Sequence, residues 1–353
     1  SQSLGFRIGV DDLARVVTMD CPRKVDQLCE LLLADQVMVK PKHVSCEWFF
    51  DLPPGATPEM GHPDYDECMR LKAMCRTAMG LIIYMSNVVP EAMGPNNALC
   101  GCAGEPSNVL CVGAPEQNHL RALRHMAMYI KAWSDGIRFG GEGCNSLEGD
   151  HPMLNPFTTG TREYRLYSST DASPKGKGVA GGIVMLAGAP LQCIAQRVHL
   201  ACPDVHSVEM VAAGTLHTIV IPINGVLQEM HIRCGRATPF MLDSGSVVFA
   251  VTNDRSVRKS TWLLRRAAPL QEGEQSFEIQ PLKVRERDQL ADPFTKYIKY
   301  DAWFRHFHII LNRQGDPPNP VSMEESKLSK TDNTAKVYVP FVTDGQAAAG
   351  DKV

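Results

Sequence analysis

The order of hydrophobic patterns in the second half of the chain most constrains how it can fold. Three strand-like segments come first, then a helix, and then strands and helices alternate. In chain order, strands are expected at residues 162–171, 178–187, 191–200, 241–243 and 277–284, and helices at 207–220, 247–251 and 288–312. Gly188–Pro190 is expected to form the turn between the second and third strands, and Pro222 to end or bend the first helix. This order predicts a mixed five-stranded α/β sheet with flanking helices.

Helical spacing dominates the first half of the chain. After one alternating strand at residues 4–10, helices are expected at 25–32, 65–89 and 116–134, and loops at 94–114 and 140–160, which are rich in Gly and Asn. We therefore expect a mostly helical region at residues 1–145, a linker at 146–160, the α/β domain at 161–313 and an extended or disordered arm at 314–353.

Bulk composition limits the partners and the compartment. The formal net charge of −3 over 353 residues gives no overall basic field, so any contact with nucleic acid must come from local patches. No apolar stretch approaches about 18 residues, and we expect no membrane-spanning helix and no membrane partner. The cysteines are scattered rather than arranged in a disulfide framework. This indicates free thiols in an intracellular, reducing compartment, without distinguishing nucleus, cytoplasm and mitochondrion.

Four acidic residues lie in or at the ends of these segments. Asp171 closes the first strand, Asp243 closes the fourth, and Glu209 and Asp292 lie in the first and last helical regions. Carboxylates from separate elements can converge on a pair of hard divalent cations, which take oxygen ligands and activate water. Each carboxylate taken alone is more simply a helix cap or a solvated group. Asp292 in particular precedes Pro293, a pattern typical of an N-cap.

Short motifs around these four residues resemble ribonuclease H. They are Thr170–Ser173, Val208–Ala213, Leu242–Ser244 and Gln289–Asp292, in the order in which that family carries its metal ligands. The segment Asp288–Lys296, DQLADPFTK, is similar to the closing signature of copia-type LTR retrotransposon Pol polyproteins. Upstream, three segments resemble the strand after the polymerase palm and the thumb and connection helices of those polyproteins: Leu4–Ile8, Met79–Met85 and His119–Lys131. The resemblance extends over residues 3–312.

The resemblance implies an RNase H-like fold preceded by a helical domain like the reverse-transcriptase thumb and connection. It implies cleavage of the RNA strand of RNA–DNA hybrids with two Mg²⁺ ions, with Asp171, Glu209, Asp243 and Asp292 as catalytic residues and metal ligands. The 2′-hydroxyl groups would identify the RNA strand. The metal-binding motif of the polymerase palm would lie upstream of residue 1, so no polymerase activity is expected.

A basic run is the candidate contact for nucleic acid, and it consists of Arg255, Arg258, Lys259, Trp262, Arg265 and Arg266. Cations interleaved with an aromatic side chain suit phosphate contacts, although such a run is also typical of a solvated face. A non-catalytic alternative stays open. In it, the chain is a domesticated retrotransposon fragment that binds structured RNA as a subunit of a large ribonucleoprotein, such as a mitochondrial ribosome. The 314–353 arm, with its apolar segment Val337–Val342, would then dock on other protein subunits.

Overall fold

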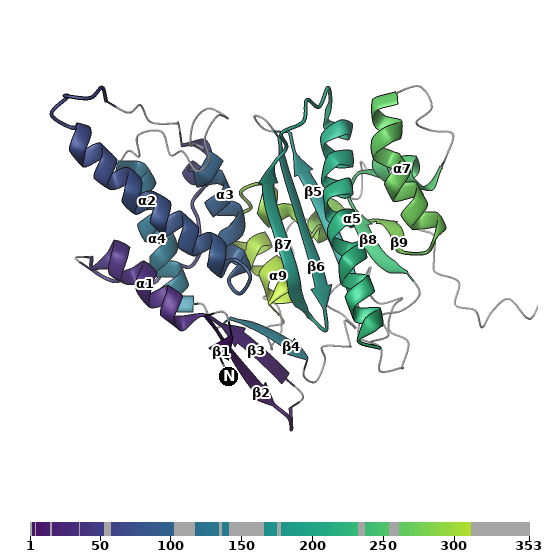
Figure 1. Ribbon diagram of the computed structural model, residues 1–353, viewed down its shortest axis with the longest axis horizontal. Coiled ribbons are helices and arrows are strands. Elements are labelled where there is room, and N and C mark those ends of the chain that lie inside the picture. Colours follow the sequence, from purple (N-terminus) through teal and green to yellow (C-terminus); the bar gives the residue numbers. More distant parts are fainter. Residues whose placement is uncertain are drawn as a thin grey trace, which may run out of the picture.

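The computed structural model describes residues 2–3, 5–14, 16–34, 36–52, 58–101, 117–133, 136–140, 166–174, 178–231, 237–253 and 261–311. A mostly helical part lies beside an α/β part (Figure 1). The helical part contains β1 (Gln2–Ser3), β2 (Phe6–Asp11), β3 (Val16–Asp20), α1 (Pro22–Leu33), the 3₁₀ helix η1 (Glu47–Asp51), α2 (Tyr65–Met85), η2 (Pro90–Ala92), α3 (Met93–Gly101), α4 (Gln117–Trp133) and β4 (Ile137–Gly140). The α/β part contains β5 (Leu166–Ser173), β6 (Val179–Leu186), β7 (Ala189–Arg197), α5 (Val205–Glu229), β8 (Thr238–Leu242), α6 (Gly245–Thr252), α7 (Thr261–Gln275), β9 (Ile279–Lys283), η4 (Glu286–Asp288), α8 (Asp292–Thr295) and α9 (Tyr300–Ile310).

The sheet of the α/β part has the strand order β7-β6-β5-β8-β9. β5, β6 and β7 form an antiparallel meander, and β8 and β9 run parallel to β5. The prediction of a mixed five-stranded sheet with flanking helices, next to a helical N-terminal part, is confirmed. The turn after β6 differs from the prediction. It consists of Ala187 and Gly188, whose φ angles of 50° and 79° suit the left-handed positions of a two-residue hairpin turn, and β7 begins at Ala189.

α5 covers one face of this sheet (Figure 1). Its residues Met210, Leu216 and Val220 are fully buried and belong to one hydrophobic cluster with Leu166 of β5 and Phe240 of β8. Removing these side chains from water ties the helix to the two central parallel strands.

The length of α5 differs from the prediction. Pro222 does not end the helix, which continues to Glu229. Pro222 is exposed, so the carbonyl group that it leaves without a partner can be hydrated. By length and composition, with a mean hydropathy of 1.6, α5 is also the one described helix that could cross a membrane. The expectation that no segment is apolar enough to cross a membrane is therefore wrong for α5. The buried side of α5 nevertheless packs on the sheet, as the buried side of a core helix does.

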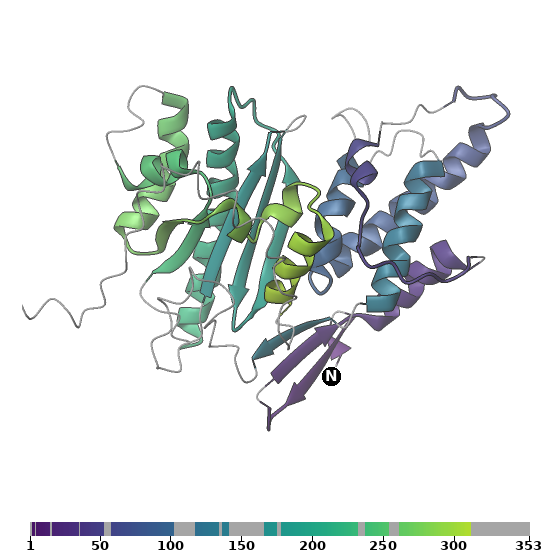
Figure 2. The same ribbon diagram turned by 180° about the vertical axis from the view of Figure 1, so that it is seen from behind.

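α9 lies on the opposite face of the sheet (Figure 2). One hydrophobic core runs from the strands through this face into the helical part, since Tyr167 of β5, Phe307 of α9 and Leu123 of α4 belong to the same buried cluster. The rings of Tyr129 and Trp303 make a T-shaped contact across the boundary at 5.7 Å. The two parts therefore share a core. The predicted linker at 146–160 and the arm at 314–353 lie outside the described residues.

The helical part departs from the prediction in three places. A four-stranded antiparallel sheet, β1-β2-β3-β4, replaces the single expected strand, because β4 pairs with β3 from beyond α4. α3 occupies the start of the expected loop at 94–114, and the rest of that segment lies outside the described residues. The helix expected at 65–89 ends earlier, at Met85, and two of its apolar residues, Met69 and Ile83, are exposed by 40% and 48%.

The closing region is broken into three short elements instead of one helix. Proline fits only in the first turn of a helix, so a new helix, α8, begins at Asp292, directly before Pro293, instead of continuing from η4. The chain is then extended at Lys296, before α9 begins. α7, which lies between α6 and β9, has no counterpart in the predicted order. The short α8 is the element that reaches the edge of the sheet near the carboxyl end of β5.

Candidate metal centre

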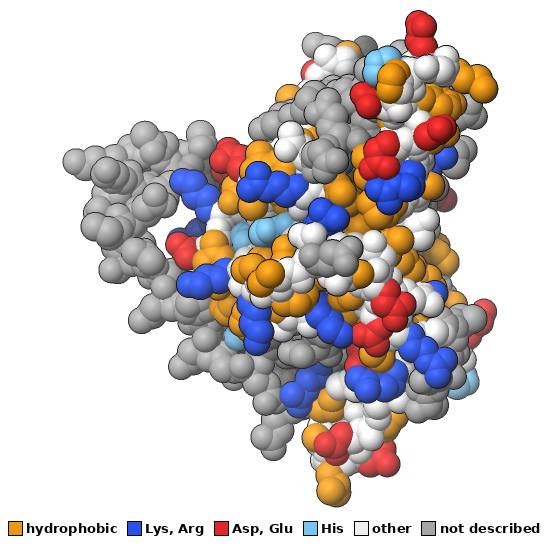
Figure 3. All heavy atoms as spheres, turned by 90° about the vertical axis from the view of Figure 1, so that its left-hand side faces the viewer, with side chains coloured by type: hydrophobic (Ala, Val, Ile, Leu, Met, Phe, Trp, Pro, Cys, Tyr) orange, Lys and Arg blue, Asp and Glu red, His pale blue; other side chains and the backbone are white. Residues whose placement is uncertain are grey.

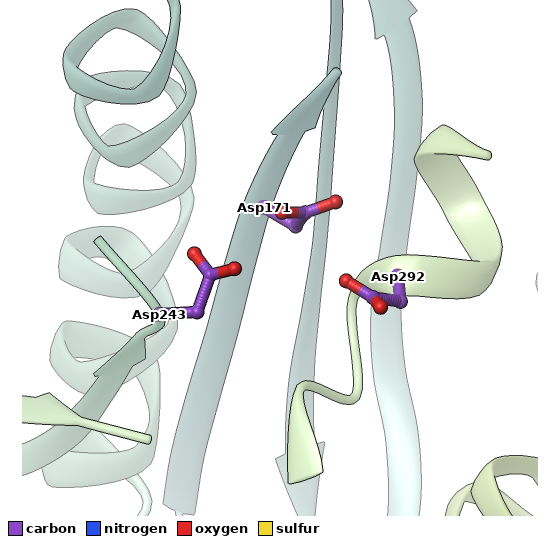
Figure 4. A group of neighbouring side chains, drawn as sticks. All are labelled: Asp171, Asp243 and Asp292. Carbon is purple, nitrogen blue, oxygen red and sulfur yellow. The ribbon is translucent and has the colours of Figure 1, made fainter. Parts of the chain in front are cut away.

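Three of the four predicted ligands converge at one edge of the sheet. Asp171 lies near the end of β5, Asp243 directly follows β8, and Asp292 is the first residue of α8. Each offers a carboxylate oxygen, and these oxygens all lie within 4.8 Å of one another. Thr170 pairs with Leu242 in the parallel register of β5 and β8, which brings the following aspartates side by side. Figure 4 shows the Asp171 carboxylate between those of Asp243 and Asp292.

Thr295 fixes Asp171 from the side of α8. Its hydroxyl group donates a hydrogen bond to Asp171 Oδ2 and lies 3.1 Å from the carbonyl oxygen of Asp292. This close approach of α8 to β6 requires Gly181, because a Cβ atom there would overlap the methyl group of Thr295. Both aspartates are nearly buried, Asp171 at 2% exposure and Asp292 at 5%.

Gln289 fastens the segment before α8 to β5. Its side chain is fully buried, and its Nε2 donates to the carbonyl oxygen of Thr170 at 2.9 Å. Its Oε1 accepts from the hydroxyl of Ser169 and, at 3.3 Å, from the amide of Ala291. Because both ends of the buried amide are used, the side chain ties the position of Asp292 to the strand that carries Asp171.

The turn after β8 joins Asp243 to the start of α5. His206 Nδ1 lies 2.9 Å from Ser246 Oγ, and Ser246 Oγ lies 3.1 Å from Ser244 Oγ. α5 itself starts at an N-cap, where Asp204 Oδ1 accepts from the amide of Ser207 at 2.7 Å. These contacts fix the start of α5 near the turn that carries Asp243, and Glu209 lies in the first turns of that helix.

Glu209 is the fourth carboxylate of the centre. It is exposed by only 8% and makes no hydrogen bond or ion pair with any residue that the structure describes. Burial, followed by the negative charges of Asp171 and Asp243, raises the pKa of Glu209 to about 9. The Glu209 oxygens are not among those that lie within 4.8 Å of one another, but the negative charges of Asp171 and Asp243 act on its carboxyl group. A buried carboxylate that makes no hydrogen bond with the described residues, and on which the charges of three other carboxylates act, fits the oxygen ligand set of a hard divalent cation.

The pKa values of two other carboxyl groups of the centre, Asp171 and Asp292, are shifted in the same direction. Burial raises the pKa of Asp171, and it raises that of Asp292 to about 8 with help from the charge of Asp171. The ammonium group of Lys296, whose Nζ lies 3.0 Å from Asp292 Oδ1, opposes both shifts. Burial disfavours the charge on Lys296, but Asp171 and Asp292 outweigh it and raise the pKa of that ammonium group. The centre thus carries an excess of negative charge.

The capping interpretation of Asp292 does not hold. The N-cap of α8 is Ala291, and no side chain makes a capping hydrogen bond there. Asp292 and Pro293 are the first two helical residues, so proline lies at the second helical position, one place later than the N-cap pattern requires. The Asp292 carboxylate is therefore directed to the acidic group and Lys296.

The predicted basic run is described only in part. Arg255, Arg258 and Lys259 lie outside the described residues, whereas Trp262, Arg265 and Arg266 lie at the start of α7. The guanidinium group of Arg266 stacks over the Trp262 ring at 5.7 Å, and both arginines are exposed. The positive charge of Arg266 also acts on Cys202, which precedes α5. This start of α7 is therefore close to the end of α5 that carries Glu209.

Three residues of the centre were not among the predicted site residues: Gln289, Thr295 and Lys296. All three lie in the DQLADPFTK segment, so their signal was present in the sequence, but neither spacing nor residue type gave them a role. Comparison of the chain with protein-family models, curated proteins and solved structures finds no match. The functional conclusion therefore has to come from the geometry of the centre.

Proposed function

We propose that this chain is a metal-dependent nuclease of the ribonuclease H type, derived from a copia-type Pol polyprotein, that cleaves the RNA strand of RNA–DNA hybrids. One observation carries the proposal. The carboxylates of Asp171, Asp243 and Asp292 come from separate segments and have oxygens within 4.8 Å of one another, and their charges act on the buried Glu209 of α5. Buried acidic groups of this density destabilise the fold unless cations bind them, which favours a functional reason for keeping them.

The order of elements supports the same proposal. An antiparallel meander, a long helix, a parallel strand, helices, a second parallel strand and closing helices agree with the fold that the resemblance to ribonuclease H implies. Asp171, Glu209, Asp243 and Asp292 occupy the strand ends and helices at which that resemblance expects the ligands.

The residues of the centre have distinct proposed roles. Two bound Mg²⁺ ions would supply water activation and neutralise charge at the scissile phosphate. Asp171, which lies between the other two aspartates, would hold the ions together with Asp243 and Asp292. Glu209 would complete the ligand set from α5. Gln289 and Thr295 would act as positioning residues, because they bind the carboxylate-bearing segments and not the reacting atoms.

Nucleic acid would enter along the start of α7. Arg265 and Arg266 are exposed there, and the Arg266 guanidinium group lies over the Trp262 ring. Such a group can contact phosphate oxygens without first losing its conformational freedom. We propose that this surface binds the backbone of the hybrid, while 2′-hydroxyl groups identify the RNA strand.

The test is a cleavage assay on the full chain with end-labelled RNA–DNA hybrid and Mg²⁺. We expect cleavage of the RNA strand only, giving 3′-hydroxyl ends, and none with an all-DNA duplex. Asp171→Asn should abolish it, whereas Glu229→Gln, at the exposed end of α5, should not. Wild-type protein that cleaves no more than the Asp171→Asn variant would overturn the proposal.

A second candidate function is the non-catalytic RNA-binding module. The observation in its favour lies in the helical part, whose end carries Lys and Arg side chains around an apolar patch (Figure 3). In the helical part, the Arg121 guanidinium group lies 5.7 Å from the Trp48 ring, beside a hollow of about 340 Å³ that Leu52 and Asn118 complete. A stacked cation in a hollow suits a phosphate and base of single-stranded RNA. Tight RNA binding that Arg121→Ala weakens and Asp171→Asn does not, without cleavage, would favour this candidate.

A further inference from the structure

A lysine side chain is built into the acidic centre. Lys296 follows α8 in an extended conformation, and its backbone amide donates to the carbonyl oxygen of Asp292 at 3.2 Å. Its Nζ lies 3.0 Å from Asp292 Oδ1, and its charge also acts on Asp171 and Glu209. Within the described part of the chain, no other lysine or arginine forms an ion pair with any of the four carboxylates.

The backbone that carries this lysine is held in place. Thr295, the preceding residue, binds Asp171 through its hydroxyl group, and Gln289 binds β5 on the other side of α8. The Lys296 side chain is 38% exposed, so most of it lies against the protein. The ammonium group is thus a resident cation with a defined place at Asp292.

Charge limits how many further cations the centre can accept. Once bound cations have displaced the protons of the carboxyl groups, four ionised carboxylates carry four negative charges, and Lys296 returns one positive charge. One divalent cation leaves the centre slightly negative, whereas two would make it positive while the ammonium group still occupies Asp292. Two cations that share one carboxylate repel each other strongly in a partly buried site.

We propose that Lys296 takes the place of one of the two divalent cations, so that the chain without nucleic acid binds a single divalent cation, beside Asp171 and Asp243. This inference rests on the proposed metal centre and adds to it the number of ions. Lys296 is then a positioning residue for the metal, and a second ion enters only where the ammonium group is displaced, as when a phosphate group attracts it away from Asp292.

The test is a Mn²⁺ titration of the full chain by calorimetry, with free Mn²⁺ counted by electron paramagnetic resonance. We expect one bound ion for the wild type. Lys296→Met should bind a second ion at least about tenfold more tightly than the wild type does. Lys296→Arg, which keeps the charge, and Lys299→Met, which removes an exposed lysine three residues away, should each bind one ion. Circular dichroism establishes that each variant is folded.

The outcomes separate the two proposals. Two ions bound by the wild type, or equal counts and affinities for the wild type and Lys296→Met, would overturn the role of the lysine and leave the metal centre standing. No Mn²⁺ bound by the wild type or by either Lys296 variant would overturn the metal centre itself. A wild-type count of two refutes the role of the lysine even if Lys296→Met does not fold.

Discussion

Replacing Glu209 by Gln should stabilise the metal-free protein at neutral pH, although it removes a side chain that the proposed hydrolysis needs. Glu209 is 8% exposed and has no partner among the described residues. Its pKa rises from the ordinary 4.5 to about 9 in the folded chain. The folded state therefore holds a proton that the unfolded state releases above pH 4.5. Because the folded state binds more protons over this range, stability falls as pH rises through it.

The magnitude follows from the same values. Each pH unit between the unfolded and folded pKa costs about 1.4 kcal/mol. At pH 7.5 the protein is about three units above the lower value, so the cost reaches roughly 4 kcal/mol. Glutamine has nearly the same shape and does not titrate. We therefore expect a gain of about 2 to 4 kcal/mol at pH 7.5 that nearly disappears below pH 5.

Urea unfolding in EDTA at pH 5.0, 6.5 and 7.5 measures this difference. Glu229→Gln is the matched control, since Glu229 lies on the same helix at its exposed end, and it should change stability by less than about 0.5 kcal/mol at every pH. A gain for Glu209→Gln that is the same at all three pH values would refute the electrostatic reasoning. So would a loss of stability at pH 7.5.

Three further predictions concern the metal, the packing of α8 and the nucleic-acid surface. Mg²⁺ should raise the melting temperature of the wild type more at pH 8.5 than at pH 6, because at the lower pH it must displace protons from carboxyl groups of raised pKa. Asp171→Asn should remove this stabilisation by Mg²⁺. A shift in melting temperature that does not depend on pH would contradict the prediction. Gly94→Ala should destabilise the fold by about 1 to 3 kcal/mol, because the new Cβ would overlap the backbone at the start of α8. Gly80→Ala, whose Cβ would meet open space on α2, should be neutral or stabilising. Equal effects of the two variants in chemical unfolding would count against the close packing of Gly94 on α8. Arg266→Ala should weaken hybrid binding in Ca²⁺ and lower the slope of log affinity against log salt by about 1, measured by fluorescence anisotropy; an unchanged slope would exclude a phosphate contact.

The strands and helices of the α/β part were largely predictable from local patterns. Apolar spacing set the strands of the meander and the buried side of α5, because burial on one face imposes a period of two or of 3.6 residues. The prediction of elements from apolar spacing failed where the pattern was weak. α7 carries exposed basic residues and an internal Pro269, and β4 pairs with a strand more than a hundred residues away. Neither leaves a periodic signal in its own segment.

The candidate site divides in the same way. The sequence by itself determined which acidic residues end a strand or lie in a helix, and so which carboxylates could meet at one edge of the sheet. Only the tertiary structure decided that Asp292 faces the centre instead of capping α8, and that Glu209 is buried without a partner. Only the tertiary structure set the Lys296 ammonium group among the carboxylates. The physical reason is that the charge state and partners of a side chain depend on neighbours brought from distant segments, whereas its place in a strand or helix depends mainly on residues close by in the chain.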